Sequence, residues 1–278
     1  MTAAGESFAS SQDTRVQIIG ILNVTPDSFS DGGIFFNEDQ AVKQALAMVS
    51  AGADIIDVGG ESTRPFAAPV LIDEELRRVI PVIKAIRKHS PIPISIDTTK
   101  AEVARVALAA GANIINDISA LRFDPEMAPL AHDADCPLII MHMQGTPETM
   151  QVNPRYNDVI SESIAFLGKR LEWAENHGIK REKIIVDPGI GFGKTVSHNL
   201  TILKHIADLK ALGCSILIGH SRKSFIGKIL GDDLHDRDTA TAAISMFCAM
   251  QGVAYLRVHD VKKTVQAVRI AEAILAAP

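Results

Sequence analysis

The segment NVTPDSFSDGG at 23–33 combines side chains that can bind anions, metals and a flat ring. It follows directly on the apolar run 16–22, so a buried strand ends where these groups begin. Loops carry binding and catalytic residues more often than the elements that they connect. We therefore interpret the segment as part of an active-site rim, with a turn shaped only by its proline and glycines as the simpler alternative. The side chains that could do chemistry here are Asn23, Thr25, Asp27, Phe29 and Asp31.

A pair of residues near the C-terminus is suited to phosphate oxygens. Arg257 and His259 occupy alternate positions of an apolar run, so in a strand their side chains point the same way. Guanidinium and imidazole N–H groups donate strong hydrogen bonds to phosphate. With Asn23 from the first apolar run, the pair predicts a donor cluster for a phosphate group.

Four more residues suit a flat heterocycle that carries a guanidine-like edge. A carboxylate accepts two parallel N–H bonds from such an edge, and a lysine donates to a ring carbonyl or nitrogen. An internal salt-bridge network of Asp97, Asp187 and Lys223 that only holds the structure is the competing interpretation, although buried ion pairs are weak evidence for stability. The four residues are Asp97, Asn116, Asp187 and Lys223.

Other polar residues have simpler explanations. The glycine-rich segment 187–195 resembles a phosphate-binding P-loop, but three residues separate Gly189 from Gly193, where that motif needs four between its glycines. His142 and His220 lack a metal-ligand spacing, so we expect structural, hydrogen-bonded histidines. Asp57 falls inside an apolar run and fits a satisfied interior acid at least as well as a catalyst.

The elements that position these residues alternate along the chain. Short β-branched apolar runs predict strands, and the longer stretches between them have the apolar spacing of helices. The expected strands are 16–22, 54–58, 92–97, 113–117, 137–142, 183–187, 215–219 and 253–258. The expected helices are 38–50, 73–89, 100–110, 125–134, 157–177, 199–212, 236–250 and 261–275.

This alternation predicts a single (β/α)8 TIM barrel, with an open doubly wound sheet as the alternative fold. Continuous apolar strands between helices are typical of a parallel sheet with covered faces, and eight repeats favour closure. Barrel active sites lie at the C-terminal ends of the strands. Every polar motif in this chain follows an expected strand, which places them all at one end.

Composition limits the class of protein. The chain has 278 residues, 47% of them hydrophobic, and a net charge of −5. Barrels of about 250 residues commonly form one domain, and the acidic balance speaks against a nucleic-acid partner. No apolar run is long enough for a membrane span, and the first residues lack the pattern of a signal peptide. We expect a cytoplasmic protein whose three cysteines are reduced, buried thiols.

Eight motifs in order carry a resemblance to dihydropteroate synthase, a pterin-binding barrel family of folate biosynthesis. The resemblance runs from about residue 17 to the C-terminus. It implies that 6-hydroxymethyl-7,8-dihydropterin diphosphate and 4-aminobenzoate are joined to 7,8-dihydropteroate and pyrophosphate, with Mg²⁺, in a homodimer. The motifs are NVTPDSFSDGG at 23–33, GGESTRP at 59–65, SIDTTK at 95–100, NDIS at 116–119, MHMQGTP at 141–147, DPGIGFGKT at 187–195, SRKS at 221–224 and RVHD at 257–260.

The resemblance also implies roles for individual residues. Asn23 would be the protein's ligand to Mg²⁺, and Asp31 would close over the reacting carbon. The implied pterin-binding residues are Asp97, Asn116, Asp187 and Lys223. The implied diphosphate-binding residues are Asn23, Thr63, Arg257 and His259. The implied aminobenzoate-binding residues are Phe29, Pro65, Phe192 and Ser224, the last where a helix is expected to begin.

Two features depart from the family pattern. Residues 1–15 form a leader rich in small and polar residues, which we expect to be disordered before a catalytic domain at 16–278. Phe66 stands where a small residue is expected after the motif at 59–65, which bears on the shape of that loop and on sulfonamide response. A methyltetrahydrofolate-binding methyltransferase and a non-catalytic pterin-binding paralogue remain the alternative functions.

Overall fold

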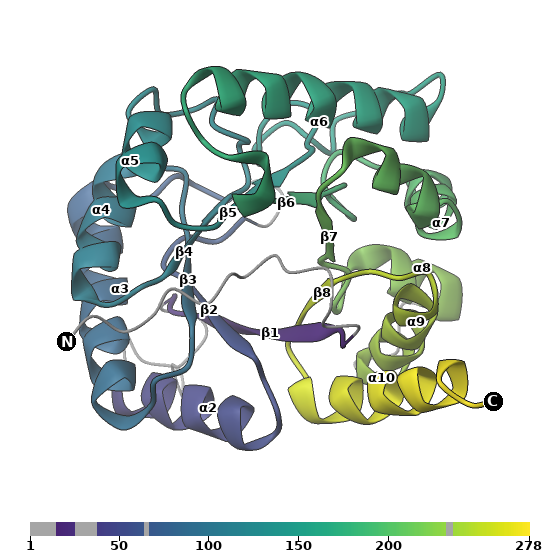
Figure 1. The fold of residues 1–278 in the computed structure, drawn as a ribbon, viewed down its shortest axis with the longest axis horizontal. Helices are drawn as coiled ribbons and strands as arrows, with labels where there is room; N and C mark the ends of the chain where they lie inside the picture. Colours follow the sequence, from purple (N-terminus) through teal and green to yellow (C-terminus); the bar gives the residue numbers. More distant parts are fainter. Residues whose placement is uncertain (1–14, 26–37, 64–66, 232–235) are drawn as a thin grey trace.

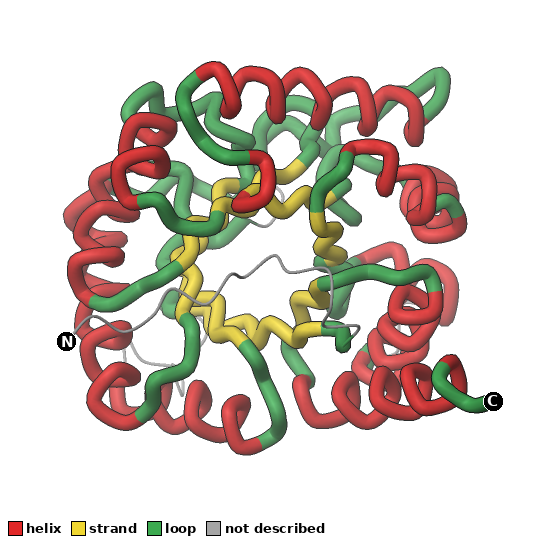
Figure 2. The backbone as a smooth tube through the Cα atoms, in the orientation of Figure 1, coloured by secondary structure: helices red, strands yellow, loops and turns green. Residues whose placement is uncertain are grey.

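The computed structural model describes residues 15–25, 38–63, 67–231 and 236–278, and it shows a closed parallel barrel. The eight strands pair in chain order, and β1 pairs with β8 through Gln17 opposite Tyr255 (Figures 1 and 2). The barrel prediction is therefore confirmed and the open sheet is wrong. The strands are β1 Gln17–Asn23, β2 Ile55–Gly59, β3 Ile94–Asp97, β4 Ile114–Asp117, β5 Leu138–Met141, β6 Ile184–Asp187, β7 Ser215–Ile218 and β8 Tyr255–Val258.

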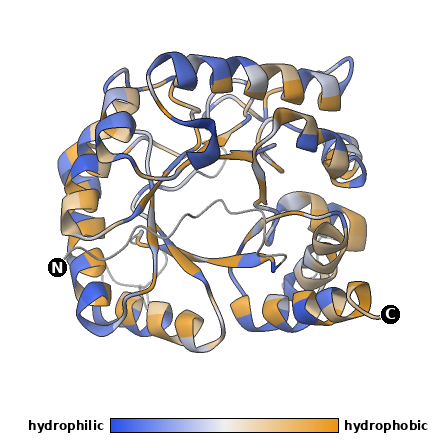
Figure 3. Ribbon diagram, in the orientation of Figure 1, coloured by the Kyte–Doolittle hydropathy of each residue, from blue (hydrophilic) through white to orange (hydrophobic). Residues whose placement is uncertain are grey.

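Helices cover the outside of the barrel. Their apolar faces pack on the strands, so the strands are buried on both sides and are largely hydrophobic (Figure 3). The α-helices are α2 Glu38–Ser50, α3 Ile72–His89, α4 Ala101–Ala110, α5 Met127–Ala134, α6 Val159–Asn176, α7 Val196–Lys204, α8 Ser224–Leu230, α9 Asp238–Met250 and α10 Val261–Leu275. The short 3₁₀ segments are η1 Arg181–Lys183 and η2 Ile206–Leu212.

The barrel interior contains an apolar layer with a polar layer next to it. Every strand except β3 contributes one buried residue to the apolar layer, which consists of Ile19, Ile55, Ile114, Ile139, Ile185, Leu217 and Tyr255. Side chains two residues apart on a strand face the same way. The residues two positions further along β2, β4, β6 and β8 therefore also face inward, and these are Asp57, Asn116, Asp187 and Arg257. The strand period thus places a polar cluster directly above an apolar floor.

The helix predictions need two corrections. The predicted helix 199–212 is wrong as a single element: a Thr195 side-chain cap starts α7 at Val196, and η2 follows it. Apolar residues recur every third position from Ile206 to Leu212, which matches the period of a 3₁₀ helix. The predicted helix 236–250 begins at Asp238, and α8 lies between β7 and α9.

Other predictions can be compared with the described residues. Cys136 and Cys248 are buried and Cys214 is half-buried, and all three are free thiols. Among the described residues, no helix is long and apolar enough to cross a membrane. The predicted leader lies almost wholly outside the described residues, which begin at Arg15.

Candidate active site

Arg257 lies at the centre of the polar cluster in the barrel mouth. Its Nε donates to Asp57 Oδ2 at 2.5 Å, and its Nη2 donates to Asp97 Oδ2 at 2.6 Å. The remaining group, Nη1, has no acceptor among the described residues, and the Arg257 side chain is 18% exposed. One edge of the guanidinium thus holds two carboxylates, while Nη1 is available to a ligand.

Asp57 is an interior acid whose hydrogen-bond acceptors all have partners. This agrees with its interpretation from the sequence as an interior acid rather than as a catalyst. Its carboxylate accepts from Arg257, from Asn116 Nδ2 at 3.3 and 3.4 Å, and from the Ser95 hydroxyl. Because Asn116 turns its Nδ2 toward Asp57, its Oδ1 is left as an acceptor. The structure therefore gives Asp57 a link to two of the predicted site residues.

Asp187 ends β6 with one carboxylate oxygen held by the protein. The backbone N–H of Gly189 donates to Oδ1 at 2.7 Å, and Oδ2 lies beside Gly219 with no donor among the described residues. Burial raises the pKa of Asp187 to about 6 and that of Asp97 to about 7, although the Arg257 charge opposes both shifts. Two buried carboxyl groups thus face the mouth and titrate close to neutral pH.

Lys223 is not part of the salt-bridge network that was the competing interpretation. Among the described residues, no carboxylate lies within ion-pair distance of its Nζ, which sits 4.0 Å from the centre of the Phe192 ring. Its side chain packs across Gly191, where a Cβ would lie 2.9 Å from Lys223 Cδ and where φ is +82°. Burial and the Arg257 charge lower the pKa of Lys223 to about 8. The Lys223 ammonium therefore forms no ion pair with a described carboxylate and is available to bind a ligand.

His259 is oriented as a neutral donor. Ser221 Oγ accepts from the His259 backbone N–H at 3.1 Å and lies 2.9 Å from Nδ1 of the ring. The hydroxyl proton can then be donated to Nδ1, which leaves the ring proton on Nε2. Burial lowers the pKa of His259 to about 3, so the ring is neutral at pH 7. Ser221 belongs to the motif at 221–224, but no role for it was predicted from the sequence.

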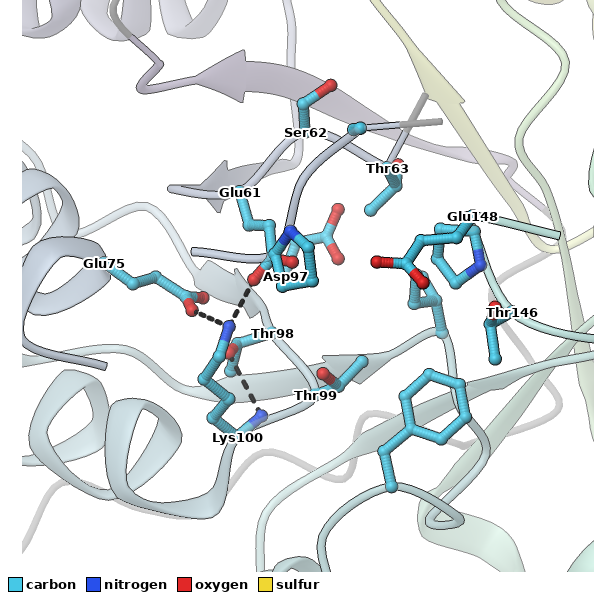
Figure 4. Close-up of a pocket in the computed structure, with 15 residues that line it drawn as sticks. Glu61, Ser62, Thr63, Glu75, Asp97, Thr98, Thr99, Lys100, Thr146 and Glu148 are labelled. Carbon is cyan, nitrogen blue, oxygen red and sulfur yellow. Dashed lines mark hydrogen bonds and ion pairs between the residues drawn. The ribbon is translucent and has the colours of Figure 1, made fainter. Parts of the chain in front are cut away.

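Asn23 at the end of β1 and Thr63 in the loop after β2 lie at the rim. Asn23 ends β1 opposite Gly59, and the structure shows no hydrogen bond from its side chain to any described residue. Thr63 lines a cavity of about 270 Å³ together with Asp97, Ile118, Phe123 and Glu148 (Figure 4). In the lining of this cavity, Lys100 bonds the Glu61 carboxylate and Glu75 Oε2, which ties the loop after β2 to α3. That clamp was not predicted.

Apolar side chains form a wall beside the polar groups. Phe192 packs with Ile118, Met141, Met143 and Met150 in a small cluster separate from the main core. Aromatic and thioether groups of this kind pack well against a flat ring. Ser224 is exposed and is the first residue of α8, so the predicted helix start is confirmed.

The structural interpretation of two histidines is confirmed. His142 Nδ1 lies 3.0 Å from Lys194 Nζ and 3.3 Å from Ser163 Oγ, and His220 Nε2 lies 2.9 Å from Ser245 Oγ. Five residues named from the sequence lie outside the described residues: Asp27, Phe29, Asp31, Pro65 and Phe66.

Comparison with known proteins agrees with this geometry. Residues 19–259 match the family described as pterin binding enzyme. The chain belongs to this pterin binding enzyme family. It is 49% identical to the dihydropteroate synthase of Synechocystis, over 94% of this chain and 90% of that protein.

Solved structures of the family have the same fold. A Yersinia pestis dihydropteroate synthase with a sulfonamide drug complex superposes with a TM-score of 0.90 at 45% identity, covering 95% of this chain and 96% of that one. A Xanthomonas albilineans dihydropteroate synthase in complex with 7,8-dihydropteroate gives 0.86 at 42% identity, covering 95% of both chains. Two solved dihydropteroate synthases thus share this barrel nearly end to end.

Proposed function

We infer that this chain is a dihydropteroate synthase, a transferase that joins a pterin diphosphate to 4-aminobenzoate with release of pyrophosphate. The observation that carries this conclusion is near-full-length similarity to relatives of that name, one of them solved with 7,8-dihydropteroate. The site has matching chemistry, because acceptors for a pterin edge stand beside donors for a leaving diphosphate. A methyltransferase acting on methyltetrahydrofolate would have no use for Arg257 and His259 in that role.

In the proposed pterin site, Asp187 Oδ2 accepts from the guanidine-like edge of the ring. Asn116 Oδ1 and Asp97 supply further acceptors, and Lys223 donates to a ring nitrogen or carbonyl. The apolar wall around Phe192 covers one face of the ring. Phe29, Pro65 and Ser224 stay proposals for the aminobenzoate site, with the partial positive charge at the start of α8 favouring its carboxylate.

The proposed reaction begins when the C–O bond between the pterin methylene and the diphosphate breaks. The bonding electrons leave with the diphosphate oxygen, and the carbocation is delocalised into the dihydropterin ring. Arg257 Nη1 and His259 Nε2 then donate to a group whose negative charge is growing, which lowers the barrier. The neutral arylamine nitrogen then forms a C–N bond with this carbon, and the proton lost from that nitrogen passes to solvent. Asp31 remains a proposal for closing over the cation.

The residues present fit a Mg²⁺ ion that binds together with the diphosphate. The described residues contain no cluster of three acidic, histidine or cysteine side chains that could hold a metal on their own. Mg²⁺ commonly binds through one or two protein oxygens plus substrate phosphates and water, and the Asn23 amide is available for this. When bound, Mg²⁺ would neutralise charge on the leaving diphosphate.

Asn23→Ala is expected to raise the Mg²⁺ concentration needed for half-maximal rate by about tenfold, the loss of one contact worth about 1.4 kcal/mol. The rate at saturating Mg²⁺ should largely recover, because the phosphate ligands remain. A Mg²⁺ titration of initial rates measures both quantities. An unchanged midpoint would remove Asn23 from the metal site.

Pterin binding is expected to weaken as the pH falls through 6. The pKa of Asp187 is raised to about 6 in the fold, so its carboxyl group becomes protonated below that pH and loses an acceptor for the guanidine-like edge. The affinity for an uncharged pterin analogue should fall by about tenfold per pH unit in that range, with one proton released on binding. Calorimetry in buffers of different ionisation enthalpy measures both. An affinity that is flat down to about pH 5 would contradict this assignment.

The activity itself is tested by incubating the protein with pterin diphosphate, 4-aminobenzoate and Mg²⁺. Pyrophosphate and dihydropteroate should form in equal amounts, and omission of aminobenzoate should abolish dihydropteroate formation. A non-catalytic paralogue would bind the pterin without releasing pyrophosphate. A methyltransferase would transfer a methyl group from methyltetrahydrofolate and leave the pterin diphosphate intact.

The quaternary structure and cellular location are also proposals. Exposed apolar side chains occur on α7, α8 and α9, which supports a homodimer that covers this side of the barrel. Sedimentation of the wild type should give about twice the chain mass of 29.9 kDa, and Phe247→Glu should shift it toward one chain. A cytoplasmic location fits the proposed use of folate precursors. The exposed residues are Leu200, Ile229, Leu230, Phe247 and Met250.

A further inference from the structure

Asp57 is a buried acid that no ligand can reach. Its side chain is 0% exposed, and its acceptors are taken by Arg257, Asn116 and Ser95, from three other strands. Asp57 can therefore influence the reaction only through the neighbours that it holds.

Arg257 contacts two carboxylates that differ in whether a ligand can reach them. Asp57 holds Nε inside the barrel, where nothing from solvent competes for it. Asp97 holds Nη2 but is 8% exposed and lines the cavity in Figure 4. A ligand that bonds Asp97 competes for the contact to Nη2 and leaves the contact to Nε in place.

The register of the barrel shows what Asp57 does to the arginine. Arg257 pairs with Ile19 of β1, whereas Asp57 pairs with Ile21, two residues closer to the mouth. The Arg257 side chain must therefore run toward the mouth to reach Asp57. A carboxylate at this position draws the guanidinium toward the mouth, where Nη2 reaches Asp97 and Nη1 has no acceptor among the described residues.

We propose that Asp57 is a positioning residue for Arg257: it fixes Nε so that Nη1 meets the leaving diphosphate while the pterin takes up Asp97. The proposal rests on the proposed function, because it deepens the role of Arg257 in that reaction. Asp57 does not touch the reacting atoms. Its removal is expected to displace Arg257 and to lower the rate of the chemical step.

The first test compares Asp57→Asn with Asp54→Asn. Both variants replace a carboxylate in or next to β2 by its amide. Asp54 directly precedes β2, at the end of the strand away from the barrel mouth, and its carboxylate accepts from the Ile18 backbone N–H and from Arg15. Asp57→Asn should lower kcat by about 10- to 100-fold, the scale for a misplaced catalytic group. It should also weaken binding of pyrophosphate with Mg²⁺. Asp54→Asn should change neither quantity, whatever it does to the melting temperature.

The second test is a double-mutant cycle with Arg257→Ala. If Asp57 acts through Arg257, Asp57→Asn should lower kcat no further once the arginine is absent. An equal loss in both backgrounds would overturn the proposal and make Asp57 a purely structural acid. Asp57→Ser provides a smaller variant for the same cycle should the amide fold poorly.

The outcomes separate this proposal from the proposed function. A wild type that forms dihydropteroate, with an Asp57→Asn variant that matches Asp54→Asn, overturns the role of Asp57 alone. A wild type that forms no product overturns the function, and the pyrophosphate titration then still decides Asp57. Pyrophosphate that binds wild type and Asp57→Asn equally well contradicts the proposal in either case.

Discussion

Arg257→Ala is expected to lower kcat by on the order of 10²-fold, comparable to the loss of one oxyanion donor. The diphosphate gains negative charge as its C–O bond breaks, so its donors bind the transition state more strongly than the ground state. Single-turnover kinetics at saturating Mg²⁺ measures the chemical step directly. If the variant raised only KM and left that step unchanged, Arg257 would be a uniform phosphate anchor.

The structure adds a stability effect to this variant. Arg257 forms ion pairs with both Asp57 and Asp97, and breaking a buried pair by removing one partner costs about 3–5 kcal/mol. Arg257→Lys is the matched control because it keeps the charge but loses the planar, multi-donor geometry. It should recover stability more fully than rate. Urea unfolding of both variants, run beside the kinetics, separates the two effects.

Asp187→Ala is expected to weaken binding of a pterin analogue by about 2–3 kcal/mol, or roughly 30- to 150-fold, the scale for hydrogen bonds to a charged group. The loss arises because the donors of the guanidine-like edge would be buried without an acceptor. Calorimetry with the folded variant gives this number. Binding of pyrophosphate should stay close to the wild-type value, since its proposed donors, Arg257 and His259, lie on β8 and directly after it.

Asp187→Asn sharpens the assignment. The amide keeps the shape and one acceptor, but it presents an N–H₂ group and cannot accept two parallel N–H bonds. Affinity should remain well below wild type, and the pH dependence centred near 6 should disappear with the titrating group. Wild-type affinity in this variant would assign Asp187 to the structure of the loop that follows β6.

The barrel could be predicted because each strand and helix has its own local pattern. Apolar runs and helical spacing recur eight times, and glycines that follow several of the helices, such as Gly111 and Gly213, adopt positive φ. The segment 199–212 was harder, because apolar residues three apart fit an irregular α-helix and a 3₁₀ helix almost equally well. Only the tertiary packing of η2 decides between them.

The ion pairs of the site could not be predicted in the same way. The pairing of carboxylates with cations depends on the stagger between neighbouring strands. This register cannot be predicted from the sequence alone. Lys223 was therefore a plausible partner for Asp97, whereas Arg257 holds that position. The inward orientation of Asp57 does follow from the strand period. Asp57 stands two residues after the interior residue Ile55, just as Arg257 stands two residues after the interior residue Tyr255.

The central claim is that Asp187 binds the pterin while Arg257 and His259 bind the diphosphate. Its most direct test is a crystal structure with a pterin analogue, pyrophosphate and Mg²⁺. The expected result is a pterin whose guanidine-like edge meets Asp187, with pyrophosphate bonded to Arg257 Nη1 and His259 Nε2 and Mg²⁺ on Asn23. A pyrophosphate bound away from Arg257 and His259, or a pterin that leaves Asp187 without a contact, would contradict this assignment.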